Sequence, residues 1–127
     1  MKQDANQKIS EFIDGHREEM LSLWQEVVNM ESGSGYKAGI DAVARRFQQV
    51  LDGAGAVTRI VEMEKAGNML IGEVGAGRTK PAVLFMGHMD TVFAIGTVAK
   101  RPFTIKDGTA YGPVSYTHLT LPTNREV

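Results

Sequence analysis

The chain has 127 residues, with 14 Lys and Arg against 15 Asp and Glu and a formal net charge of −1 at pH 7. This length corresponds to about one domain, and 43% apolar with 23% charged residues is typical of a globular protein rather than a disordered one. The small net charge gives no general electrostatic case for nucleic-acid or anionic-membrane binding, and the absence of cysteine excludes disulfides, thiolate metal sites and cysteine nucleophiles.

The N-terminal residues, MKQDANQKISEF, lack the apolar stretch of a signal peptide. No apolar run in the chain approaches the roughly 20 residues that a membrane span needs. We therefore expect the chain as written to be cytoplasmic and not to bind membranes, with a secreted or periplasmic parent protein as the alternative.

Two helices are predicted in the first half of the chain. Residues 4–30 carry apolar side chains at steps of three and four, and His16 on that face is interpreted as a histidine at the edge of the core. Residues 38–51 repeat this helical spacing. Between them, Ser32–Gly35 (SGSG) interrupts the pattern; we interpret it as a loop or cap, with an anion-binding loop as the alternative.

Strands are predicted after residue 55. Residues 57–62 and 69–74 are short apolar runs that favour a strand pair, and residues 102–106 and 109–111 favour a hairpin around Asp107-Gly108. Residues 82–86 (AVLFM) are continuously apolar, which is typical of a strand buried on both faces. The sequence therefore predicts an α/β domain, with two N-terminal helices followed by strands of a mixed central sheet.

The chemistry-bearing residues follow the apolar run at 82–86. Side chains two apart in extended chain point the same way, so His88 and Asp90 are predicted to share one face at a strand end. A neutral imidazole can bind a divalent metal while a carboxylate accepts its other ring N–H. This is half of a site, because a catalytic zinc takes about three protein ligands. From spacing alone, the alternative is a satisfied polar pair at a strand end.

Three ordered blocks resemble the dizinc exopeptidase family, namely LFMGHMDTV (84–92), GTVAKRPF (96–103) and AYGP (110–113). That family includes glutamate carboxypeptidase, acetylornithine deacetylase, succinyl-diaminopimelate desuccinylase and aminoacylase. The resemblance covers roughly residues 5–113. The Lys-Arg-Pro-Phe motif is most similar to the glutamate carboxypeptidase branch.

The resemblance implies a role for each residue of the pair and a reaction. His88 matches a zinc ligand, and Asp90 matches the catalytic carboxylate that orients it. Family members hold two zinc ions about 3.5–4 Å apart, and their reaction is hydrolysis of an amide bond next to a free carboxylate. The implied substrate is a small peptide or an N-acyl amino acid, and a homodimeric parent is compatible with the resemblance.

The family pattern stops matching after Pro113. The family continues with Gly and a metal-bridging Asp where this chain has Val114 and Thr117. The general-base Glu and the other family ligands have no counterpart in the chain, and His118 is not counted as a ligand. Residues 114–123 (VSYTHLTLPT) instead resemble the in-frame translation of a sequencing-library adapter.

We therefore expect residues 1–113 to be the N-terminal part of a zinc-peptidase catalytic domain and residues 114–127 to be a non-native tail. A chain with one candidate zinc ligand is expected to be inactive by itself. Two alternatives remain open. One is a complete non-enzymatic α/β binding module in which His88 and Asp90 are structural, and the other is a metallohydrolase of a different class.

Overall fold

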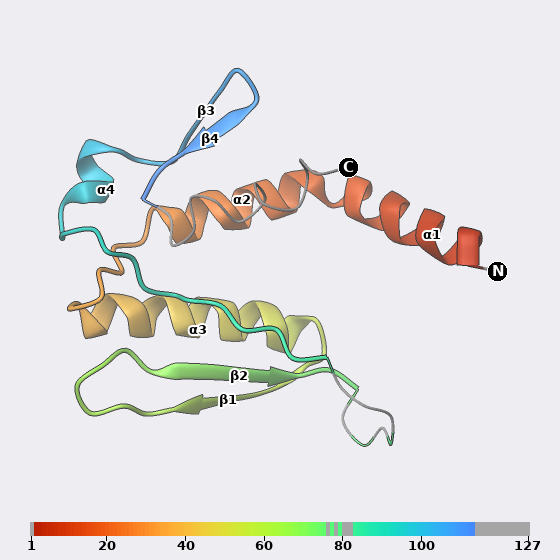
Figure 1. Cartoon of the computed structure of the whole chain (residues 1–127), viewed down its shortest axis with the longest axis horizontal. Coiled ribbons are helices and arrows are strands. Elements are labelled where there is room, and N and C mark those ends of the chain that lie inside the picture. The colour runs from red at the N-terminus through yellow and green to blue at the C-terminus, as the bar shows by residue number, and fades with distance from the viewer. Residues whose placement is uncertain (1, 76, 78, 80–82, 114–127) are drawn as a thin grey trace, which may run out of the picture.

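The computed structural model describes residues 2–75, 77, 79 and 83–113. Its elements in chain order are α1 (Lys2–Gly15), α2 (Arg17–Val28), α3 (Lys37–Gly53), β1 (Val57–Val61), β2 (Met69–Glu73), α4 (Thr97–Lys100), β3 (Thr104–Lys106) and β4 (Thr109–Tyr111) (Figure 1). Helices followed by antiparallel strands confirm the predicted α/β class. The tail expected over residues 114–127 lies outside the described residues. No helix in the described part of the chain is long and apolar enough to cross a membrane.

The helix predicted over residues 4–30 is divided into α1 and α2 at His16. The backbone of His16 leaves helical geometry, with φ −110° and ψ 13°. Its Nδ1 lies 2.7 Å from the carbonyl oxygen of Phe12, and its ring stacks on Phe12 with the ring centroids 4.1 Å apart. The preceding Gly15 is a poor helix former, which weakens the helix at this point. The contact of the His16 side chain with the Phe12 carbonyl can therefore end α1 here.

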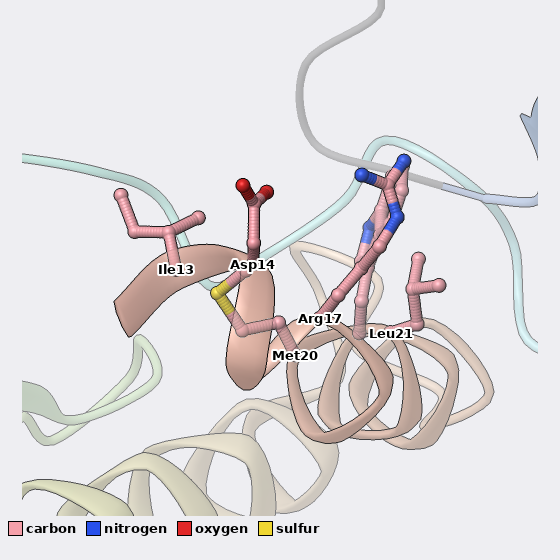
Figure 2. Close-up of a pocket in the computed structure, with 6 residues that line it drawn as sticks. Ile13, Asp14, Arg17, Met20 and Leu21 are labelled. Atoms are coloured by element: carbon pink, nitrogen blue, oxygen red, sulfur yellow. The ribbon is translucent and has the colours of Figure 1, made fainter. Parts of the chain in front are cut away.

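The apolar face of α1 is largely exposed, because no other described element covers it. The side chain of Phe12, for example, is 65% exposed. At the junction with α2, a pocket of about 300 Å³ is lined by Ile13, Asp14, Arg17, Met20, Leu21 and Trp24. Figure 2 shows that Asp14 and Arg17 project to the same side of this junction. The core of the molecule therefore begins at α2.

Helix α3 provides most of the core. Its buried residues Ile40, Val43 and Ala44 lie on one face at helical spacing, and α3 packs against the β1–β2 pair (Figure 1). The pairing register runs from Val57 opposite Glu73 to Val61 opposite Met69. The predicted second helix and strand pair are thus confirmed.

The β3–β4 hairpin closes as its sequence predicts. Asp107 and Gly108 occupy its turn with φ values of 51° and 74°, the left-handed conformation that two-residue hairpin turns require. Phe103, just before β3, is buried and meets Trp24 of α2 edge-on. This contact anchors the hairpin to α2.

The central strand predicted over residues 82–86 is wrong for the described residues 83–86. They belong to no strand, and their side chains are between 76% and 91% exposed. Residues 84–88 face β2 across a cavity of about 630 Å³ instead of pairing with it. A buried strand needs partners at its edges and cover on its faces, and the described residues provide neither. The mixed central sheet is accordingly absent from this part of the chain, where two separate antiparallel pairs are found.

A polar cluster ties the β1–β2 loop to the first turn of α3. Lys37 Nζ donates to Asn68 Oδ1 at 2.7 Å and lies 2.9 Å from Asp41 Oδ2. The Asn68 backbone N–H donates to Asp41 Oδ1 at 2.7 Å. The Asn68 N–H and then the Lys37 ammonium hold the pKa of Asp41 below its ordinary value of 3.8.

This cluster is expected to open in acid. A carboxyl whose pKa is lower in the folded state stabilises the fold above its unfolded pKa, and the contribution is lost as the pH falls through the folded value. The Asn68 amide should therefore keep its NMR position above pH 3.8 and move below it. In Asp41→Asn the amide should show no such transition, and a wild-type transition that persisted in this variant would contradict the assignment.

Candidate metal-ligand site

The segment at residues 87–90 brings His88 and Asp90 together. His88 Nδ1 lies 3.3 Å from Asp90 Oδ1, so the predicted shared face is observed. The His88 side chain is 70% exposed and that of Asp90 is 34% exposed. The imidazole is therefore accessible to a ligand, whereas the Asp90 carboxylate is partly enclosed.

The loop before α3 holds Asp90 from the other side. Ser34 Oγ donates to Asp90 Oδ2 at 2.6 Å, and the Ser34 backbone N–H donates to the Thr91 carbonyl at 2.8 Å. Thr91 N–H donates in turn to the Ser32 carbonyl at 2.9 Å, and Gly33 forms a parallel bridge with Thr91. The sequence of this loop indicated only a loop or cap, or an anion-binding loop. Its role in holding Asp90 was missed.

The same loop also fixes the chain beyond the pair. Glu31 Oε1 accepts the backbone N–H groups of Gly96 and Val98 at 2.9 and 3.1 Å, at the start of α4. Residues 31–34 therefore form hydrogen bonds near both ends of the segment from residue 90 to residue 98. Asp90 therefore lies at one end of a segment that this loop holds by hydrogen bonds at Thr91, Gly96 and Val98, and His88 lies two residues before it.

Hydrogen bonding stabilises the charged form of Asp90. The Ser34 hydroxyl is the main cause that lowers the pKa of Asp90; partial burial opposes it, and His88 adds to the lowering. Asp90 is therefore ionised at neutral pH and can accept hydrogen bonds on both oxygens. An ionised carboxylate is the form that can orient an imidazole N–H.

The pair lines a cavity of about 300 Å³ between the β1–β2 loop and the residue 87–90 segment. Ser34, His88 and Asp90 supply polar groups, while Ile40 and Met69 are among its apolar lining residues. This volume lies at the lower end of the range for small-molecule pockets, and a few polar groups in an apolar wall are typical of them. The site can therefore accept a small ligand beside the imidazole.

The donor set fits part of a zinc site. Within the described ranges, no group of three or more His, Cys, Asp or Glu residues is placed to hold a metal ion. His88 offers one nitrogen donor, and Asp90 is placed to orient it rather than to replace a second ligand. A catalytic zinc takes about three protein ligands, and His88 is one candidate for such a ligand.

Comparison with known proteins supports the resemblance seen in the sequence. Carboxypeptidase G2 of Pseudomonas sp. (strain RS-16) is 35% identical over 99 residues, which cover 74% of this chain and 23% of that protein. The chain is a distant relative of carboxypeptidase G2. It spans about a quarter of the length of that relative. No protein-family model matches the chain. An uninterrupted stretch that covers 74% of the chain includes positions 88 and 90 wherever it begins. The aligned region therefore includes His88 and Asp90.

Gly33 is expected to be essential for the contact between the loop and Asp90. A Cβ added at Gly33 would lie 2.5 Å from the Phe93 carbonyl oxygen, which is part of the backbone and cannot swing aside. Gly33→Ala should therefore lower the free energy of unfolding by about 1–3 kcal/mol, the usual cost of overpacking. Urea denaturation followed by circular dichroism measures this change.

Gly35 provides the matched control in the same loop. A Cβ there meets nothing within 4 Å, and Gly35 does not have a positive φ. Gly35→Ala should change the free energy of unfolding by no more than about 0.5 kcal/mol. Equal destabilisation by both substitutions would show that the close approach of Gly33 to Phe93 is not the cause.

Proposed function

We propose that this chain carries part of the active site of a zinc-dependent hydrolase that cleaves an amide bond next to a free carboxylate. The observation that carries the proposal is the arrangement of His88 Nδ1 against Asp90 Oδ1, with Asp90 fixed by Ser34. Zinc-binding histidines characteristically direct their second ring nitrogen to such a carboxylate. The relationship to a carboxypeptidase supports a peptidase or N-acyl amino acid deacylase over other zinc hydrolases.

Each residue of the pair has one task in this proposal. His88 would hold a zinc ion through Nε2, and Asp90 would orient the ring and raise its basicity as a ligand. Bound zinc supplies a water of lowered pKa and polarises the scissile carbonyl. The remaining ligands and the general base belong to residues outside the described part of the chain. Residues 1–113 are thus proposed to be the N-terminal part of the catalytic domain, and the substrate a small peptide or N-acyl amino acid.

Zinc titration of the 127-residue chain tests the ligand assignment. In NMR spectra of the histidine rings, Zn²⁺ should shift the resonances of His88 and leave those of His16 in place. Asp90→Asn should weaken zinc binding at His88 about 10–100-fold, the usual effect of removing the partner of a ligand histidine. Zinc binding that is unchanged in His88→Ala would contradict the assignment and favour the non-enzymatic module.

The chain by itself is expected to show no turnover. Hydrolysis of an N-acyl-glutamate in the presence of zinc should proceed no faster than with the His88→Ala variant, because a catalytic zinc takes about three protein ligands and this chain offers one candidate. Release of glutamate above that control would show that the 127 residues contain a complete site. A colorimetric assay for free glutamate measures the rate.

A further inference from the structure

We propose that Ser34 is a positioning residue that sets the tautomer of His88 through the carboxylate of Asp90. The inference rests on the proposed function, because the tautomer matters for metal binding only if His88 is a ligand. Ser34 lies 56 positions away from Asp90 in the sequence and would not contact the metal. Its effect would be transmitted by two consecutive hydrogen bonds.

The first of these bonds runs from Ser34 to Asp90. The Ser34 hydroxyl oxygen lies 2.6 Å from Asp90 Oδ2 and 3.0 Å from the Thr91 carbonyl oxygen, but it has a single proton to donate. The Thr91 carbonyl already accepts the Ser34 backbone N–H at 2.8 Å. The charged carboxylate is also the stronger and nearer acceptor. The hydroxyl proton is therefore assigned to Asp90 Oδ2.

The second bond runs from His88 to the other oxygen of the same carboxylate. His88 Nδ1 and Asp90 Oδ1 are 3.3 Å apart, longer than the usual range for an N–H···O bond. A small rotation of the carboxylate would break a contact of this length. Because Ser34 holds Oδ2, it restricts that rotation and keeps Oδ1 directed at Nδ1.

This arrangement selects one form of the neutral ring. A carboxylate accepts but cannot donate, so the ring proton has to reside on Nδ1, and the lone pair is then on Nε2. Neutral histidine in water favours the opposite tautomer, with its proton on Nε2. The position of the proton on His88 therefore reports whether Asp90 is held in place.

Ser34 is itself fixed by backbone contacts that do not involve its hydroxyl. Its N–H and the Gly33–Thr91 bridge attach it to the residue that follows Asp90. Tyr36 N–H donates to the Gly33 carbonyl at 2.7 Å, which closes the turn into α3. Removal of the hydroxyl alone should leave these contacts intact. Substitutions at Ser34 can thus separate positioning from folding.

Nitrogen NMR of the ¹⁵N-labelled 127-residue chain tests the proposal without metal. Spectra are recorded at about pH 8.5. In the unsubstituted chain and in Ser34→Thr, the Nδ1 and Nε2 shifts of His88 should report a proton mainly on Nδ1. In Ser34→Ala and Ser34→Val, the majority of the protons should move to Nε2. The His16 shifts, measured in the same spectra, should not change.

Thr and Val at position 34 form the decisive pair, because they have the same shape and differ in the hydroxyl. The Val variant should also bind Zn²⁺ at His88 about 10-fold more weakly than the Thr variant. If the two variants show the same tautomer ratio, the positioning role is overturned even if Ser34→Ala fails to fold. If the tautomer differs as expected but His88→Ala does not alter zinc binding, positioning is supported and the proposed hydrolase function fails.

Discussion

Replacing His88 with alanine in a hybrid enzyme is expected to reduce its peptidase activity by at least about a hundredfold, the upper end of what loss of an orienting partner costs. The hybrid is carboxypeptidase G2 with its aligned region, 23% of that protein, exchanged for the matching residues of this chain. Loss of the ligand would remove the metal itself. Loss of the Asp90 or Ser34 side chain would only misorient the His88 ring. The effect of His88→Ala should therefore exceed theirs.

Release of glutamate from a peptide that ends in glutamate, together with the zinc content of the purified protein, measures this effect. His16→Ala is the matched control, because His16 contacts Phe12 and lies far from the site in the sequence. It should leave both the rate and the zinc content unchanged. A folded hybrid that retained full activity and zinc without the His88 ring would refute the ligand assignment.

Truncation of Phe103 is expected to cause the largest loss of stability in the chain. The Phe103 side chain is 7% exposed, and its ring meets that of Trp24 with the centroids 5.3 Å apart. A Phe→Ala change in a core costs about 3–5 kcal/mol, through lost burial and the cavity left behind. Domains of this size have only about 5–15 kcal/mol of net stability. The C-terminal hairpin should therefore separate from α2 or the whole fold should be lost.

The backbone at Phe103 separates the side-chain effect from hydrogen bonding. Its N–H donates to Asn29 Oδ1 at 2.8 Å, and alanine retains this bond. Ile105 in β3 is the matched control, since its side chain is 54% exposed and its truncation should cost far less. Urea unfolding followed by Trp24 fluorescence, the signal of the chain's single tryptophan, compares the two. Equal midpoints for both variants would show that Phe103 is not the anchor.

Features determined by neighbouring residues were predicted correctly from the sequence. Helix α3 has a clear apolar stripe, and the Asp107-Gly108 turn depends on two residues that tolerate positive φ. The contact between His88 and Asp90 follows from the alternation of side chains in extended chain. The division at His16 was missed because it depends on a side-chain hydrogen bond to the Phe12 carbonyl that no periodicity reveals.

Features determined by distant residues were not predicted. The run at residues 82–86 has the composition of a buried strand, but burial depends on partners, and none covers residues 83–86. The SGSG loop did contain one indication of the role of Ser34. A serine between two glycines can bring its hydroxyl and backbone close to another segment. Its partner could not be named, since nothing in the sequence pairs residue 34 with residue 90.

The uncovered stretch at residues 83–86 has a consequence for the behaviour of the protein in concentrated solution. Val, Leu, Phe and Met in succession, uncharged and exposed, form the kind of segment that stacks into cross-β fibrils. Lys80 and Pro81 lie before it in the sequence, separated from it by Ala82, and are the residue types that act as gatekeepers against such stacking. Solubility should therefore depend on this pair, and replacement of both with apolar residues should favour fibril growth.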